Sequence, residues 1–585
     1  MSANKQSALE QLGFSAYRPL QEEAIDALLN NRDVVLAAPT GGGKSLVYQV
    51  AGLAKEGVAV IVSPLIALMK QQVEFLNLKS VQARFLNSTL NPGEQDDLTW
   101  SIRHNHIKFL YLSPEKLIQP SVIGLLQSVD IALFAIDEAH CIAQWGGYFR
   151  PEYNQLGQIK QLFPAPPIVA LTGSADKTTL NSINQSLNLH NSLLLKGSID
   201  RPNLQLQVAQ KKQAKQQILY FLHHEVAGLS GIIYCRSRNS TEQLSQWLNQ
   251  LGFSSVYYHA AMQDEAKNSS HKIFSEQLGT IMVATTAYGM GIDLPHIGFV
   301  IHMDLPSSPE SYYQEIGRAG RNNQSAKTLL LYGLQDMIKA QQLIALEARD
   351  YFTEAQRLRD LFAIIESRQC RKQSLLAYFD EEIEECGYCD RCRAKQKEHN
   401  VTIAAQKLLS LIYHTRGTQA FSTLIQVLLG KRVKATKNIQ AEKLSLFGQG
   451  KELSEAQWKS VIRHLLAFEY IQLENTQVFF VRLTEKARQI LKGEAQLIVA
   501  NDFYYPRLSE SELSNEHLAW HTVSAWRHRK SVPLSDVQLR KICQHKPKNA
   551  ASLSRLVGIS LEEVNHFAES LLVLLHQEQS TSVLQ

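Results

Sequence analysis

The sequence predicts a multidomain α/β protein in which two parallel-sheet domains stand in tandem, with a largely helical region after them. The chain has 585 residues, which is too long for one hydrophobic core. Short β-branched runs alternate with helical patterns over residues 1–205, and the alternation repeats over 210–333. Beyond residue 340 the strand signal stops and cysteines gather near one another.

The strands of both domains are predicted from short apolar runs that end in a turn-forming or polar residue. Such runs are typical of buried parallel strands joined by helical crossovers. In the first domain the runs are "DVVLAAP", "VAVIVSP", "IKFLYLSP", "IALFAID" and "PIVALTGS". In the second they are "GIIYCRS", "SSVYYHA", "TIMVATT", "IGFVIHMD" and "TLLLYG". We expect "GSIDRPNLQLQV" to be the join between the two domains.

The composition is that of an ordinary globular protein, 44% hydrophobic and 20% charged. The formal net charge of +5 permits a polyanionic partner without requiring one. No window approaches the roughly 18 apolar residues of a membrane span, and "MSANKQSALEQLGF" lacks the apolar core of a signal peptide. Seven cysteines are too few for a disulfide scaffold, and four of them lie near one another, so we expect a metal site in a reducing, cytoplasmic environment.

A phosphate-binding loop is predicted in "AAPTGGGKSLVYQ", between a strand and a helix. The glycines allow backbone N–H groups to surround phosphate oxygens. Lys44 can reach the outer phosphates and the Ser45 hydroxyl can take a magnesium position. The usual first glycine is Ala38 here; the alternative, a simple Gly-rich turn, does not explain strand, Gly-Lys-Ser and helix in this order. The expected nucleotide-binding residues are Thr40, Gly41, Gly42, Gly43, Lys44 and Ser45.

An acidic pair follows the strand "IALFAID". Asp137 can hold magnesium through water, and Glu138 can polarise an attacking water. An Asp-Glu pair after a strand is commonly a solvated strand end. Together with the phosphate loop it predicts ATP hydrolysis.

Two arginines, Arg318 and Arg321, stand three residues apart in "YYQEIGRAGRN". The guanidinium group presents a fixed fork to phosphate. An arginine delivered from a second domain can stabilise the charge of a hydrolytic transition state. The alternative is a surface helix with two solvated arginines.

The ordered motifs resemble those of the RecQ family of superfamily-2 DNA helicases, over nearly the whole chain. "LGFSAYRPLQEEAI" is similar to the motif that reads adenine, which implies stacking by Phe14 and edge contacts from Arg18 and Gln21. "VSPLIALMKQQV" and "YLSPEKL" resemble strand-tracking motifs. "VATTAYGMGIDLPHIGFVIHMD" and the arginine motif resemble the paired motifs of the second domain. The resemblance implies an ATP-dependent 3′–5′ DNA helicase of recombination, repair and replication.

An aromatic cluster directly after the Asp-Glu-Ala-His box matches an aromatic-rich loop of the family. Aromatic faces stack on unpaired bases of any sequence, contributing about 1–3 kcal/mol per base. We therefore expect this loop to couple single-stranded DNA to hydrolysis; the alternative is a core cluster under the sheet. The expected DNA-binding residues are Trp145, Phe149 and Arg150, with Pro151 and Tyr153 completing the match.

The sequence differs from the family pattern at two places where DNA binding is expected to be coupled to ATP hydrolysis. The family usually has His-Asp where this chain has Gly147 and Tyr148, and Thr-Ala-Thr-Ala where it reads Thr172-Gly173-Ser174-Ala175. At the second place the side chains remain small and still include hydroxyl groups. The first difference removes a polar pair, which predicts an ATPase that is less tightly controlled by DNA.

Four cysteines, Cys370, Cys386, Cys389 and Cys392, offer a closed thiolate set. Four thiolates suit structural zinc or an iron–sulfur cluster, and the resemblance to the family's zinc module favours zinc. His399 is an alternative ligand or an exposed histidine.

The resemblance divides the chain further. It implies a winged helix whose hairpin "IQLENTQVFF" can act as a wedge, and which binds single-strand-binding protein in other members. In the last region "WRHRK" is either a phosphate contact or an ordinary exposed face. The implied domains are RecA-like domain 1 (1–205, ATP-binding), RecA-like domain 2 (206–340), a zinc-binding module (341–398), a winged-helix or RQC domain (399–495) and an HRDC-like helical domain (510–585).

Two other functions remain open from the residues. The Asp-Glu-Ala-His tetrapeptide also occurs in RNA helicases, although the zinc module and winged helix argue for forked duplex DNA as the substrate. A DNA-junction-binding protein with a vestigial motor is the other alternative, and the intact Gly-Lys-Ser and Asp-Glu argue against it.

Overall fold

The computed structural model describes most of the chain, which divides into two compact units. The first unit contains residues 1–201 with the short segments 289–293 and 376–382; the second contains the remainder. The described residues are 2–39, 41–64, 66–86, 92–144, 151–173, 176–289, 294–347, 350–394, 397–475, 479–505, 515–530 and 532–577.

The first unit is built on a seven-stranded parallel sheet of order β3-β4-β2-β5-β6-β1-β7. Its central strands coincide with the apolar runs, because both of their faces are buried. The strands are β1 (Val34–Ala37), β2 (Val58–Val62), β3 (Ala83–Leu86), β4 (Phe109–Leu112), β5 (Ile131–Ile136), β6 (Ile168–Thr172) and β7 (Leu193–Lys196).

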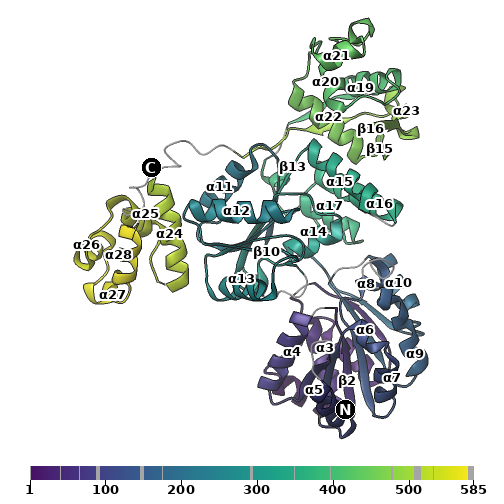
Figure 1. Ribbon diagram of the computed structural model, residues 1–585, viewed down its shortest axis with the longest axis vertical. Coiled ribbons are helices and arrows are strands. Elements are labelled where there is room, and N and C mark those ends of the chain that lie inside the picture. Colours follow the sequence, from purple (N-terminus) through teal and green to yellow (C-terminus); the bar gives the residue numbers. More distant parts are fainter. Residues whose placement is uncertain are drawn as a thin grey trace. The chain divides into compact units, whose positions relative to one another are not determined.

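Helices cover both faces of this sheet and enclose two apolar cores, one on each face. Figure 1 shows this unit in purple and blue, around the label of β2. The helices are α1 (Ser2–Gln11), α2 (Gln21–Leu29), α3 (Lys44–Ala54), α4 (Ile66–Leu78), α5 (Pro92–Arg103), α6 (Pro114–Leu117), α7 (Pro120–Leu126), α8 (His140–Gln144), the 3₁₀ helix η1 (Pro151–Gln158), α9 (Ile159–Leu162) and α10 (Lys177–Ser186).

The second unit contains a six-stranded parallel sheet of order β10-β11-β9-β12-β13-β8. The interpretation of "GSIDRPNLQLQV" as a join is wrong in its second half, which forms β8 and pairs with β13 along the whole strand. The strands are β8 (Leu204–Gln210), β9 (Ser230–Tyr234), β10 (Ser255–Tyr258), β11 (Ile281–Ala284), β12 (Ile297–His302) and β13 (Ala326–Tyr332). The surrounding helices are α11 (Ala214–His224), α12 (Arg238–Gln250), α13 (Asp264–Glu276), α14 (Pro309–Ile316) and the 3₁₀ helix η2 (Arg321–Asn323).

Helices dominate beyond β13, as predicted, and the two strands expected in "IQLENTQVFF" pair antiparallel, as β15 and β16. A short antiparallel pair, β14 with β17, was not predicted. The helices are α15 (Leu334–Glu347), α16 (Tyr351–Glu366), α17 (Arg371–Tyr378), α18 (Asp390–Arg393), α19 (Thr402–His414), α20 (Phe421–Leu428), α21 (Lys434–Asn438), η3 (Ala441–Lys443), α22 (Glu455–Ala467) and α23 (Glu485–Leu491). The strands are β14 (Glu398–Asn400), β15 (Ile471–Asn475), β16 (Phe479–Leu483) and β17 (Ile498–Ala500).

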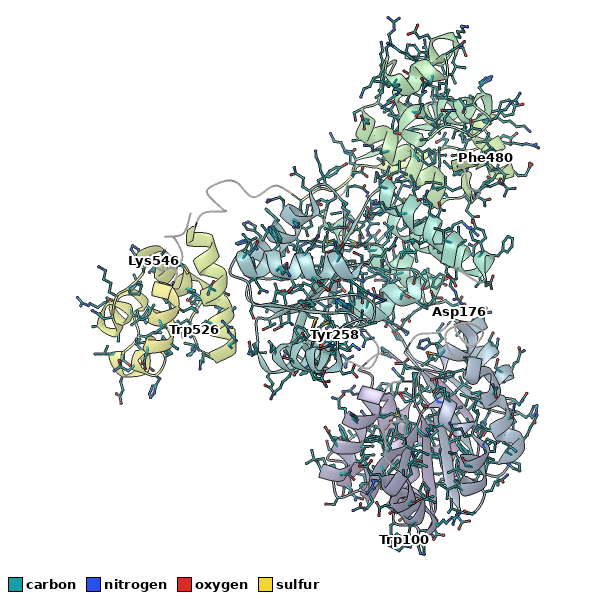
Figure 2. The ribbon with its side chains drawn as sticks, viewed as in Figure 1. Trp100, Asp176, Tyr258, Phe480, Trp526 and Lys546 are labelled. Carbon is teal, nitrogen blue, oxygen red and sulfur yellow. The ribbon has the colours of Figure 1, made fainter. Side chains whose placement is uncertain are left out.

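The last helices pack around an apolar core of their own. Trp526 of "WRHRK" belongs to this core: it is 4% exposed, and its indole N–H donates to Ser570 Oγ at 3.1 Å. Figure 2 labels this side chain within the yellow helices. The helices are α24 (Asn515–Lys530), α25 (Asp536–His545), α26 (Ala550–Val557), α27 (Leu561–Asn565) and α28 (Ala568–Gln577). Within the described part of the chain, every helix is too short or too polar to cross a lipid bilayer.

Candidate functional site

The predicted phosphate loop runs from β1 into α3, and its backbone requires glycine. Gly41 and Gly43 have φ values of 79° and 76°, a region that L-residues with a side chain rarely adopt. A Cβ on Gly42 would lie 2.8 Å from the Pro39 carbonyl oxygen. Thr40 lies outside the described residues. The loop therefore has the tight backbone that surrounds a phosphate, with the N-terminus of α3 directly behind it.

Lys44 opens α3 and points back over the loop. Its Nζ donates to the carbonyl oxygens of Ala38 at 3.1 Å and Pro39 at 3.4 Å. Ser45 follows Lys44 in the first turn of the same helix. The side chains predicted to contact phosphate and magnesium thus lie at one edge of the sheet.

Two of the residues predicted to read adenine contact the loop itself. Gln21 is buried, its Nε2 donates to the Gly43 carbonyl at 2.8 Å, and its Oε1 accepts the Arg18 backbone N–H at 2.8 Å. The Arg18 guanidinium donates to the Gly41 carbonyl. Phe14 is 43% exposed, so its ring is accessible for stacking. These contacts join the predicted adenine motif to the phosphate loop.

Asp137 stands directly after β5, with its backbone N–H donating to the Val62 carbonyl at 2.9 Å. Burial, together with the negative charge of Glu138, raises the pKa of Asp137 to about 7, and the Lys44 ammonium opposes that rise. A buried carboxylate with its pKa raised in this way gains from a nearby cation. Oxygen donors from Asp137 and Ser45 fit Mg²⁺, which prefers oxygen ligands.

His140 was not singled out from the sequence, and it links the acidic pair to the end of β6. Its Nδ1 lies 3.3 Å from Glu138 Oε2 and 3.2 Å from Thr172 Oγ1, and the ring is buried. Glu138 itself has φ of 49°, an uncommon value for a residue other than glycine. The sequence signal for His140 was its place as the fourth residue of the Asp-Glu-Ala-His box. Its contact with Thr172 could not be predicted, because the two residues are far apart along the chain.

For Tyr153, which completes the match to the aromatic-rich loop, the alternative prediction of a core residue is confirmed. It is fully buried, and its hydroxyl lies 3.5 Å from the Asp137 carbonyl oxygen. Its ring packs in the core under the sheet because η1 carries apolar residues on the same face. The remaining predicted positions at this site lie outside the described residues: Trp145, Gly147, Tyr148, Phe149, Arg150, Ser174 and Ala175.

Arg318 and Arg321 follow α14 in the second unit. Both side chains are buried, at 7% and 6% exposure, which excludes a surface helix with two solvated arginines. The turn between them requires Gly320, with φ of 65°. Asn203 Nδ2 holds this turn by donating to the carbonyl oxygens of Gly320 at 2.6 Å and Gln324 at 2.5 Å. The arginines are thus fixed by the fold rather than left in solvent.

The four predicted cysteines form one cluster, with all sulfur atoms within 4.8 Å of one another. Measured Sγ–Sγ distances are 3.9 Å for Cys370–Cys389, 3.9 Å for Cys386–Cys392 and 3.4 Å for Cys389–Cys392. Four thiolates around zinc at about 2.3 Å would stand about 3.8 Å apart. A hydrogen bond from the Cys389 thiol, with another from the Cys386 N–H, lowers the pKa of Cys370, whereas the same thiol pairing raises the pKa of Cys389.

His399 is not part of this cluster. It lies on β14, exposed, and its Nε2 is 3.0 Å from Asn501 Oδ1. The alternative of a histidine ligand is therefore wrong, and the four-cysteine set matches a closed structural site.

Comparisons with known proteins agree with this geometry. Four family models match the chain: DEAD/DEAH box helicase (residues 18–183), helicase conserved C-terminal domain (211–323), RecQ zinc-binding (334–393) and RQC domain (395–504). The chain is similar to proteins named ATP-dependent DNA helicase RecQ. In Pasteurella multocida the identity is 35%, covering 98% of this chain and 94% of that protein. In Haemophilus influenzae it is 34%, covering 97% and 95%, and in Bacillus subtilis 30%, covering 94% of each.

The phosphate loop, the Asp-Glu-Ala-His box, the buried arginine pair and the four-cysteine cluster occur in the order in which these models match. With identity of this extent over nearly the whole length of the relatives, the chain belongs to the RecQ family of helicases.

Proposed function

We propose that this protein is an ATP-dependent DNA helicase that moves 3′ to 5′ along single-stranded DNA and unwinds duplex DNA in recombination, repair and replication. The observation that carries the proposal is the buried acidic pair beside the phosphate loop, in a chain whose relatives are named DNA helicases. The direction of movement rests on the resemblance to the family. ATP with Mg²⁺ and a structural Zn²⁺ are its cofactors.

In this proposal the first unit binds and hydrolyses ATP. Lys44 and the backbone of Gly41 to Gly43 bind the phosphates, while Phe14, Arg18 and Gln21 hold the adenine. Ser45 and Asp137 would hold Mg²⁺, which neutralises phosphate charge when bound. Glu138 orients and polarises the attacking water, and its 3.3 Å contact with His140 restrains the carboxylate.

Arg318 and Arg321 stabilise the negative charge that develops around the γ-phosphate in the transition state of hydrolysis. A guanidinium held by the fold costs no reorganisation when the transition state forms. Their burial and the Asn203 clamp support this role.

Trp145, Phe149 and Arg150 bind single-stranded DNA in this account and report its presence to the adjacent acidic pair. The winged-helix region binds forked duplex DNA through phosphate contacts, so binding should weaken with salt. It is also the proposed site for single-strand-binding protein. The proposed location of the protein is the cytoplasm, in association with the nucleoid.

The proposed domains are two RecA-like domains over 1–205 and 206–340, a zinc module over 341–398, a winged helix over 399–495 and an HRDC-like domain over 510–585. The separate apolar core of the last helices supports an independent final domain.

The test is ATP hydrolysis by the full chain with single-stranded DNA, with single-stranded RNA and without nucleic acid. DNA should stimulate the rate and RNA should not; Lys44→Ala should abolish hydrolysis, and Glu138→Gln should abolish turnover while ATP still binds. Stimulation by RNA alone would favour an RNA helicase. Unwinding that survives Lys44→Ala would favour a junction-binding protein with a vestigial motor.

A further inference from the structure

One short segment between the zinc-site cysteines belongs to the first unit. The segment Leu376–Glu382, which we call the strap, lies in that unit with residues 1–201, whereas the chain on either side of it belongs to the second unit. In the sequence the strap stands between Cys370 and Cys386. The chain therefore leaves the cysteine cluster, enters the first unit and returns to the cluster.

Helix α17 connects the cysteine cluster to the strap. Its first residue, Arg371, directly follows Cys370. The Arg371 guanidinium bonds the Asp390 carboxylate, with Nε–Oδ1 at 3.0 Å and Nη2–Oδ2 at 2.9 Å, and both side chains are buried. Asp390 stands between Cys389 and Cys392. The start of α17 is thus fixed to the segment that carries the last two cysteines.

The strap closes α17 with a tight turn. The Glu381 N–H donates to the Leu376 carbonyl oxygen at 3.0 Å. The Asp380 N–H donates to the Ala377 carbonyl oxygen at 3.1 Å. Asp380 has φ of 56°, the left-handed conformation that commonly ends a helix in this hydrogen-bond pattern, and Phe379 before it is buried. The turn therefore fixes two carboxylates at the end of the helix.

Both carboxylates accept backbone N–H groups of the first unit. Asp380 Oδ2 accepts from the Lys177 N–H at 2.9 Å, at the start of α10, where a negative charge also suits the helix dipole. Glu381 Oε2 accepts from the Ile199 N–H at 2.8 Å. The Ser198 hydroxyl donates to the other Glu381 oxygen. The strap thus holds the start of α10 and the segment after β7.

These two places have a bearing on coupling. Helix α10 begins just after the segment 172–175, where DNA binding is expected to be coupled to ATP hydrolysis. Its N-cap residue is Asp176, which Figure 2 labels and which accepts from the Thr179 N–H at 2.7 Å. Ile199 stands shortly before Pro202, where the chain passes from the first unit to the second. The strap therefore holds one end of the coupling segment and one end of the connection.

We propose that the strap transmits the folded state of the zinc module to the first unit and so keeps ATP hydrolysis responsive to DNA. This rests on the proposed function, in which DNA stimulates hydrolysis. Asp380 and Glu381 are positioning residues that touch neither nucleotide nor DNA; they act by holding α10 and the segment at Ile199. A module that loses its metal loses folding energy, and the strap is then released.

Three double variants separate hydrogen bonding from charge. Asp380→Gly/Glu381→Ala removes both carboxylates and keeps the turn, because glycine is the usual residue in that left-handed position. Asp380→Asn/Glu381→Gln removes the charges and keeps an acceptor oxygen at each position. The control, Glu382→Ala/Glu384→Ala, removes two exposed negative charges nearby, so it matches the change in net charge that affects DNA binding.

The first experiment measures kcat and KM for ATP hydrolysis by the full chain, with and without single-stranded DNA. Asp380→Gly/Glu381→Ala should keep the basal kcat and KM, while the ratio of stimulated to basal kcat falls about fivefold. The Asn/Gln variant and the control should keep ratios within about twofold of wild type. Glu381→Ala alone repeats the comparison if the double variant does not fold.

An unchanged ratio in the Gly/Ala variant, or basal and stimulated rates that fall together, would overturn the proposal. So would a ratio in the control or in the Asn/Gln variant as low as that of the Gly/Ala variant, because hydrogen bonds from the strap would then not account for the loss.

The second experiment follows amide hydrogen exchange in the full chain before and after a chelator removes the metal. The Lys177 and Ile199 N–H groups should exchange about tenfold faster without metal, because their acceptors lie on the strap. The amides of β5, in the centre of the sheet, should keep their rates. Unchanged exchange at Lys177 and Ile199 would overturn the link to the cysteine cluster. The proposed function fails by a different result: if DNA does not stimulate wild-type hydrolysis, that function is wrong, and the exchange rates still decide whether the strap responds to the metal.

Discussion

Arg463 Nε lies 2.7 Å from Glu366 Oε1, and both side chains are almost wholly buried, at 2% and 1% side-chain exposure. Arg463 lies on α22 and Glu366 is the last residue of α16, so the pair joins two helices that pack together. The Tyr332 hydroxyl of β13 donates to the same carboxylate at 2.7 Å, and Asp502 lies 2.5 Å from Arg463 NH2. The sheet, the helix before the zinc cluster and the winged-helix region thus share one buried ionic network.

Removing one partner of this network should destabilise the protein strongly. Arg463→Ala leaves Glu366 charged and buried, which typically costs about 3–5 kcal/mol. We expect a large decrease in the unfolding midpoint of the second unit in thermal melts. The control is Arg488→Ala, which removes an exposed pair with Glu485 and should change stability by less than about 1 kcal/mol. Equal midpoints for the two variants would refute a structural role for the network.

The same network predicts acid sensitivity. Burial raises the pKa of Glu366, but Arg463, His464 and the Tyr332 hydrogen bond outweigh burial and hold it at about 2, below the ordinary value of 4.5. Because the folded-state pKa is the lower one, this stabilisation is complete above about pH 4.5 and is lost as the pH falls toward 2. It amounts to about 3 kcal/mol. Unfolding free energy measured against pH should fall over this window, and Glu366→Gln should remove that part of the slope; an unchanged slope would contradict the assignment.

Loss of zinc should unfold the cysteine module without a direct effect on the chemistry of ATP. Cys389→Ser should abolish bound zinc and make the segment around residues 370–393 sensitive to protease, because a structural zinc site contributes folding energy. Metal analysis and limited proteolysis are the measurements. Cys543→Ser, at a buried cysteine in the last helical domain, should keep one zinc per chain. Iron, with visible absorbance, in place of zinc would show an iron–sulfur cluster instead.

The dipeptide Gly147-Tyr148 predicts an ATPase that responds less to DNA than relatives with His-Asp at that place. Gly147→His should increase the ratio of DNA-stimulated to basal hydrolysis, since it restores a polar side chain among the predicted stacking residues, between Trp145 and Phe149 in the sequence. Rates with and without single-stranded DNA give this ratio for wild type and variant. No change in the ratio would show that this position does not take part in coupling.

The sequence predicted those parts of the fold in which one segment carries its own signal. Central strands such as β2 and β5 are buried on both faces, so they appear in the sequence as continuous apolar runs. The edge strands β3 and β7 are partly exposed and interrupted by polar or solvent-facing positions, so the same criterion missed them. Strand β8 was taken for a join because glutamines alternate with its apolar residues.

In the candidate site, too, features with a local sequence pattern were predicted and contacts between distant residues were not. The phosphate loop, the acidic pair, the arginine motif and the cysteines are each contiguous or closely spaced, and each was found from its own pattern. The contact of His140 with Thr172 joins residues that are distant along the chain. For Tyr153 the sequence left both a stacking ring and a core ring open, because an aromatic residue beside a predicted binding loop does not reveal which way its ring points.

The measurement that tests the central claim most directly is ATP-dependent separation of duplexes with a 3′ or a 5′ single-stranded tail, with Lys44→Ala as the control. The account predicts that wild-type protein separates the 3′-tailed duplex when ATP and Mg²⁺ are present, leaves the 5′-tailed duplex largely intact, and loses this activity in the variant. Intact 3′-tailed duplexes, together with an ATP hydrolysis rate that does not change when DNA is added, would contradict it.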